Sequence, residues 1–152
     1  MENLERIVSE HPFFAGIDSQ YTRLLSGCAR NVRYPAGSYI FYEGDEANEL
    51  YLLRGGRVAL EIFTPQHQPI VLSTVSEGEM LGWSWLVPPY TWKFNAHAIQ
   101  DTRAIALDGK CMREKCEENH DLGYEVLKRF AQDVDQRLGA TRLQLLDVYA
   151  VK

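Results

Sequence analysis

The spacing of apolar and polar positions changes twice along the chain. Residues 3–30 carry apolar side chains such as Leu4, Ile7 and Leu25 at helical intervals. From Val32 the period falls to two, and glycine or proline turns interrupt it at about 8–12-residue spacing. After Asp108 the helical period returns. The pattern predicts one domain over 1–152, made of N-terminal helices (1–31), a strand region (32–108) and C-terminal helices (109–150).

The strand region contains roughly eight short predicted strands. The clearest alternating runs are residues 38–42, 49–53, 57–63, 70–75, 94–99 and 102–107. Glycine-containing turns such as Arg54-Gly-Gly56 separate them. Short strands at regular spacing with such turns are typical of a β-sandwich or β-barrel.

A long helix is predicted from a cap at Asp121 to about Val148. Its apolar positions are separated by alternating fours and threes, which is a heptad repeat. These positions are Leu127, Ala131, Val134, Leu138, Thr141, Leu145 and Val148. A 3.5-residue repeat favours a partner helix, so we expect this seam to form a homodimer interface. Packing of the seam on the chain's own strands is the alternative.

Composition and charge exclude several classes of protein. The chain has 152 residues, of which 45% are hydrophobic and 24% charged, as in ordinary globular domains. Its start, Met-Glu-Asn-Leu-Glu-Arg, is not a secretory signal and no run suits a membrane span, so a cytoplasmic location without a membrane partner is expected. The net charge of −5, with no run of Lys or Arg longer than a pair, argues against nucleic acid as a partner.

Residues that could carry metal or catalytic chemistry are sparse. The three cysteines, Cys28, Cys111 and Cys116, are an odd number without a CxxC pair, so no disulfide framework is expected. Cys111 and Cys116 are five residues apart, on different faces of a helix, so no metal site is assigned. No common catalytic motif is present, and no catalytic residue is assigned. We therefore predict that the chain is not an enzyme.

The segment 77–95 concentrates unusual residue types. It holds all three tryptophans, the Pro88-Pro89 pair and one cation, Lys93. Glycine and proline there are incompatible with an ordinary central strand. The aromatic rings could form the wall of a ligand pocket or fill the interior of a small β-structure.

The glycine pattern resembles a known family. The stretches 34–45 (YPAGSYIFYEGD), 50–60 (LYLLRGGRVAL) and 78–82 (GEMLG) are similar to the cyclic nucleotide-binding domain of the catabolite activator and Fnr-type regulators, over about residues 5–148. The resemblance implies an α+β fold. This fold is an eight-stranded antiparallel β-roll (a double-stranded β-helix, jelly-roll-like) with N-terminal helices and a long C-terminal helix. It also implies that a cyclic nucleotide binds at segment 77–95, the cassette.

The cassette departs from the family pattern at both polar positions. In the family a Gly-Glu pair binds the ribose, and an Arg ten residues later binds the phosphate. Here Gly82 is followed by Trp83, whose indole nitrogen only donates. Lys93 or, counted from the following strand, Trp92 stands at the Arg position. Lysine lacks the bidentate fork of arginine, so tight binding of cAMP or cGMP is not expected.

The favoured function is a regulatory ligand-sensing module that binds a cyclic nucleotide weakly or takes another small aromatic or anionic ligand. The predicted pocket residues are Val71, Ser73, Gly82, Trp83, Ser84, Trp85, Trp92, Lys93, Phe94 and Asn95. The related transcription factors continue into a DNA-binding domain, whereas this sequence stops at Lys152, so output through an unknown partner protein is expected. The alternatives are a ligand-free dimeric interaction module and, less favoured, a haem or metal sensor.

Overall fold

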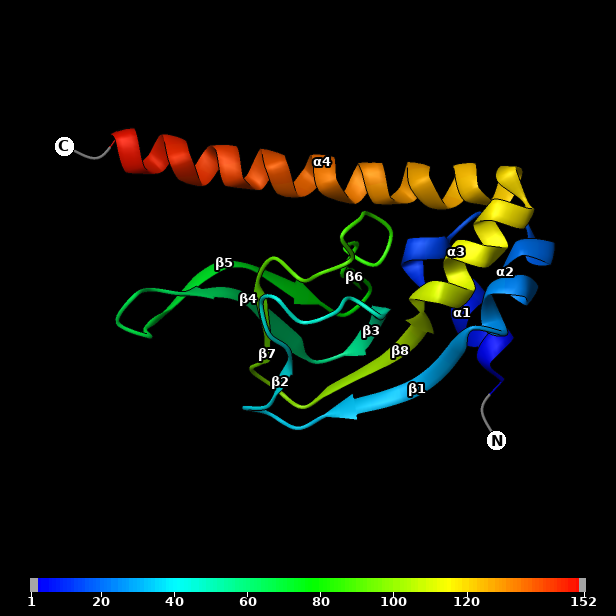
Figure 1. Ribbon diagram of the computed structural model, residues 1–152, viewed down its shortest axis with the longest axis horizontal. Helices are drawn as coiled ribbons and strands as arrows, with labels where there is room; N and C mark the ends of the chain where they lie inside the picture. Colours follow the sequence, from blue (N-terminus) through cyan, green and yellow to red (C-terminus); the bar gives the residue numbers. More distant parts are fainter. Residues whose placement is uncertain (1–2, 151–152) are drawn as a thin grey trace.

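Helices at both ends of the chain flank an antiparallel β-structure in the computed structural model, which describes residues 3–150 (Figure 1). The helices are α1 (Leu4–Glu10), η1 (Pro12–Phe14, 3₁₀), α2 (Ser19–Ser26), α3 (Gly109–Glu118) and α4 (His120–Ala150). The strands are β1 (Ala29–Tyr34), β2 (Tyr39–Phe41), β3 (Glu49–Gly55), β4 (Arg57–Phe63), β5 (Pro69–Ser76), β6 (Met80–Leu81), β7 (Asn95–Ala98) and β8 (Thr102–Asp108). The α+β prediction, with eight strands and a long C-terminal helix, is confirmed.

The strands form two four-stranded sheets, in the orders β1-β8-β3-β6 and β2-β7-β4-β5, with every pairing antiparallel. Buried side chains from both sheets meet in one core, among them Leu50 and Leu52 on β3 and Val58 and Leu60 on β4. Burial of these alternating aliphatic positions is the main force that holds the roll together.

Helix ends follow side-chain capping, with one correction. Asp18 caps α2, since its Oδ1 accepts a hydrogen bond from the Gln20 amide at 2.9 Å. The predicted cap of the long helix, Asp121, is wrong. Asn119 is the capping residue, because its Oδ1 accepts from the Leu122 amide at 3.1 Å, and α4 therefore begins at His120.

Helix α4 runs along one side of the roll (Figure 1). Its buried residues all lie in the first eleven positions: Leu122, Gly123, Val126 and Phe130. Phe130 contacts the rings of Phe13 and Trp85. The helix is therefore anchored at one end, while the half that carries most of the predicted seam has no buried residue. Over residues 3–150, no helix has the length and apolarity required to cross a membrane.

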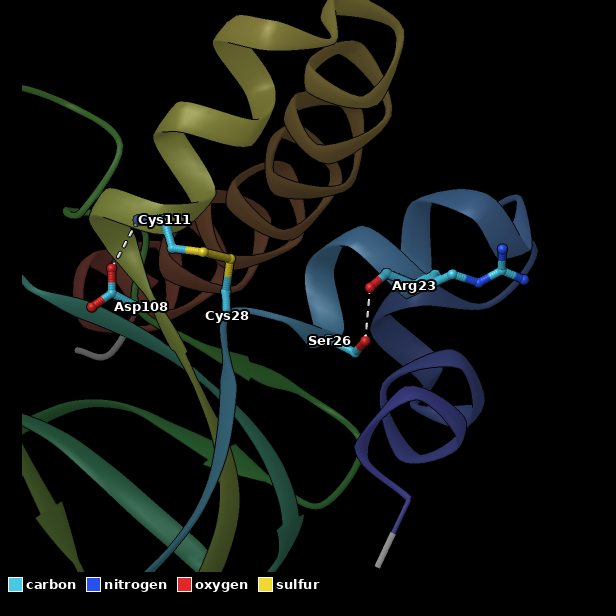
Figure 2. The surroundings of a disulfide bond; sticks show 5 residues. All are labelled: Arg23, Ser26, Cys28, Asp108 and Cys111. Carbon is cyan, nitrogen blue, oxygen red and sulfur yellow. Dashed lines mark hydrogen bonds between the residues drawn. A yellow bond between two sulfur atoms is a disulfide. The ribbon is translucent and has the colours of Figure 1, made fainter.

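No disulfide framework was expected, but Cys28 and Cys111 form a disulfide (Figure 2). The register of β1 on β8 pairs Ala29 with Leu107, which brings Cys28, just before β1, beside the start of α3. The Asp108 amide donates to the Cys28 carbonyl at 2.9 Å, and Asp108 Oδ1 caps the Cys111 amide. The pairing depends on strand register, which cysteine spacing does not reveal.

Candidate ligand-binding site

A cavity of about 280 Å³ lies between the roll and α4. Its wall comes from β4, β5, β6, the cassette and α4, and consists of Leu60, Leu72, Ser73, Val75, Met80, Leu81, Gly82, Trp83, Phe94, Val134, Arg137, Leu138 and Thr141. The wall is mostly apolar, and its polar side chains are those of Ser73, Arg137 and Thr141. An apolar pocket with a few polar groups is the usual form of a small-molecule site.

The cassette leaves β6 through a turn that requires glycine. Gly82 has φ +97°, and a Cβ added there would lie 2.4 Å from the Trp92 ring. The Trp92 ring in turn stacks on Phe41, with ring centroids 3.7 Å apart and planes 4° apart, and the residue is only 2% exposed. Trp92 is therefore a core residue on which the cassette folds.

Trp85 anchors the middle of the cassette. It is fully buried, and its ring centroid is 5.4 Å from that of Phe130 on α4. Arg113 on α3 donates to the Trp85 carbonyl, and its guanidinium lies 4.3 Å from the centre of the Tyr90 ring. The cassette is thus fastened to both C-terminal helices by contacts that are part of the fold.

The predicted pocket residues divide into two groups. Ser73, Gly82, Trp83 and Phe94 line the cavity, and both rings are half-buried. The other six lie elsewhere: Trp85, Trp92 and Ser84 are buried, Val71 is 55% exposed, and the two remaining residues are Lys93 and Asn95.

Lys93 and Asn95, expected to bind the polar end of a ligand, have other partners. Lys93 is exposed, and its Nζ lies 3.4 Å from Thr91 Oγ1, within the same loop. Asn95 is buried, and its Oδ1 accepts from the Glu43 amide at 2.8 Å. No cation of the cassette therefore lines the cavity.

The positive charge in the cavity wall comes from a residue that was not predicted from the sequence. Arg137 on α4 lines the cavity and donates from Nη1 to Ser73 Oγ at 3.0 Å and from Nε to Asp133 Oδ2 at 3.0 Å. Burial raises the pKa of Asp133, and the Arg137 charge opposes that rise. An Asp-Arg pair four residues apart on a helix usually marks a solvated face, so the sequence offered only a weak signal.

The seven predicted interface residues are all exposed in the chain by itself, so none of them is part of the chain's own buried core. Three of them, Val134, Leu138 and Thr141, also border the cavity. The pocket and the seam therefore share one stretch of α4, in which Arg137 and Leu138 are neighbours.

Comparison with known proteins gives relatives of more than one kind. The Lysophospholipase nte1 of Neosartorya fischeri is 24% identical over 86% of this chain, which spans 9% of that protein's length. The CRP-like cAMP-activated global transcriptional regulator of Mycobacterium tuberculosis is 22% identical over 95% of this chain, which spans 63% of the regulator's length. The Cyclic AMP receptor protein of Thermus thermophilus is 31% identical over 63% of this chain and 44% of its own length. A cyclic nucleotide-binding domain from Methylobacillus flagellatus has a TM-score of 0.80 at 19% identity, covering 98% of this chain and 84% of that one.

The family assignment rests on a match to more than half of the chain. The sequence model described as "Cyclic nucleotide-binding domain" matches residues 31–119, from β1 to the end of α3. This range contains the whole cassette and every strand except the first two residues of β1. The chain therefore belongs to the family of cyclic nucleotide-binding domains.

Proposed function

We propose that this chain is a regulatory ligand-sensing domain that works as a homodimer and signals through a partner protein. The observation that carries the proposal is the shared stretch of α4. Val134, Leu138 and Thr141 face the cavity and also belong to the exposed heptad seam. A ligand in the cavity would touch the same helix turns that pair with a second copy, so occupancy and helix pairing are coupled.

The proposed ligand is not cAMP or cGMP at ordinary affinity. The mycobacterial relative is named as cAMP-activated, but this cassette has an indole, Trp83, where the family places the ribose-binding carboxylate. The nearby cation, Lys93, lies outside the cavity wall. A lost hydrogen bond to a charged group costs about 1.5–3 kcal/mol, and two are lost here. The expected affinity for cyclic nucleotides is therefore weak.

The ligand-free alternative has one observation in its favour. Trp85 and Trp92 fill the interior of the roll, as expected if the cassette aromatics served packing only. Trp83 differs from them, because it is half-buried beside an open cavity. This difference supports ligand sensing over a purely structural cassette.

Charge placed on the seam is expected to dissociate the dimer. Leu145 is on the seam and 54% exposed, and it does not line the cavity, so Leu145→Glu leaves the pocket unchanged. A carboxylate in a paired helix seam is desolvated without a partner, so the dimer should weaken at least about 100-fold. Sedimentation equilibrium over a concentration series measures this change.

The matched control is Leu143→Glu, because Leu143 is a 65% exposed leucine of the same helix that lies off the seam. It should leave the dimer constant within about twofold. Equal weakening by both substitutions, or a wild-type chain that stays monomeric throughout, would refute the proposed dimer.

A further inference from the structure

Among the residues that line the cavity, Arg137 has the one charged side chain. The rest of the wall offers aliphatic and aromatic surface, with hydroxyls from Ser73 and Thr141. Recognition of a charged ligand group in this cavity therefore depends on a residue of α4. In the family pattern, the charged residue that binds the ligand lies in the cassette.

Asp133 holds the guanidinium of Arg137 in place. Asp133 accepts from Nε at 3.0 Å, and its carboxylate is not part of the cavity wall. Both side chains of the pair are largely shielded from solvent, at 21% and 14% exposure. A shielded pair with charge-assisted geometry orients the guanidinium more strongly than an exposed pair would.

The guanidinium retains donors that the protein does not use. Arginine carries five N–H groups. Within residues 3–150 three of them have acceptors: Nε on Asp133, Nη1 on Ser73 at 3.0 Å, and Nη2 on the Met80 carbonyl at the long distance of 3.5 Å. The terminal Nη nitrogens, which bind carboxylates and phosphates in a bidentate manner, are thus only partly engaged at the cavity wall.

We infer that the cavity selects a small organic anion, with its apolar body against Trp83, Phe94 and Leu138 and its anionic group on Arg137 and Ser73. The inference rests on the proposed function, since it names the ligand class of the same pocket. Recognition of the anion by α4 itself transmits binding to the helix without an intermediate, because Arg137 is adjacent to Leu138 of the seam.

Two dyes with one body separate the ionic contribution from the apolar one. 8-Anilinonaphthalene-1-sulfonate carries a sulfonate on the frame of N-phenyl-1-naphthylamine, which is uncharged, and both fluoresce in apolar surroundings. We expect Arg137→Gln to weaken binding of the sulfonate about tenfold or more, because a charge-assisted contact is lost, and to leave the neutral dye within about twofold. Arg137→Lys should retain part of the preference, since it keeps the charge but not the fork.

Two control variants test whether the dyes bind in the cavity and whether the loss of affinity is specific to Arg137. Arg142→Gln removes an exposed arginine of the same helix that is outside the cavity wall, and it should change neither titration. Thr141→Trp places a large side chain at the exposed rim of the cavity and should remove binding of both dyes.

The outcomes distinguish the two proposals. If Thr141→Trp removes both dyes but Arg137→Gln leaves the sulfonate unaffected, the inference about the anion is overturned and the pocket remains a ligand site. Equal losses on Arg142→Gln and Arg137→Gln would also overturn the inference, because they would reflect the charge of the helix as a whole. If Thr141→Trp affects neither dye, both the inference and the ligand-binding role of the pocket are overturned.

Discussion

Replacing Trp92 with alanine is expected to lower the free energy of unfolding by about 3–5 kcal/mol, the usual cost of truncating a buried aromatic ring. The residue is 2% exposed, stacks on Phe41 and supports the turn at Gly82, so its loss opens a cavity that the rigid neighbours cannot fill. Urea denaturation followed by far-ultraviolet circular dichroism measures the change.

The control for this prediction is Trp83→Glu, which also distinguishes the two candidate functions. Because Trp83 is half-buried at the cavity, the substitution should cost less than about 1.5 kcal/mol under the ligand-sensing proposal and chiefly alter ligand choice. A loss of several kcal/mol at Trp83, comparable to that at Trp92, would instead favour the ligand-free module with a purely structural cassette.

Reducing the Cys28–Cys111 bond is expected to destabilise the native chain by about 2–5 kcal/mol. The bond joins residues 83 apart in sequence, and long loops lose the most entropy when a crosslink constrains the unfolded chain. It also ties the start of α3 to the α2–β1 junction, so its loss frees the helix that holds the cassette through Arg113. Urea unfolding with and without a phosphine reductant measures the effect.

Cys28→Ala and Cys116→Ala provide the matched comparison. The first should abolish the response to reductant and the second should preserve it, since Cys116 is the free cysteine and burial raises the pKa of its thiol. The native chain should also show one reactive thiol in non-reducing denaturant. Three reactive thiols, or a urea unfolding midpoint that the reductant does not change, would contradict the assigned disulfide.

The strands and helices were predictable where periodicity extends over several residues. β4 was predicted with its observed bounds, 57–63, because seven residues show the alternation and glycines precede it. β6 was not named, since its two residues are too few to define a period. The start of β1 at Ala29 was assigned to the preceding helix, because Cys28 and Ala29 are compatible with either structure.

The binding site was less predictable, because it depends on which way adjacent side chains face. The sequence located the cassette, but its three tryptophans divide between core and cavity according to the turn at Gly82 and the packing of Trp85 on Phe130. Lys93 stands at the family's Arg position when counted from Gly82, yet it is not part of the cavity wall and contacts Thr91 instead. Arg137 required the placement of α4 over β5, which no local pattern encodes.

Isothermal titration calorimetry of the native chain with cAMP tests the central claim most directly. With two charge-assisted contacts missing, at about 1.5–3 kcal/mol each, a site that would bind in the micromolar range should bind near millimolar or weaker. The account predicts no saturation below about 0.1 mM cAMP. A saturable, one-site isotherm with a micromolar or tighter dissociation constant would show that the altered cassette still recognises the nucleotide, and would contradict the account.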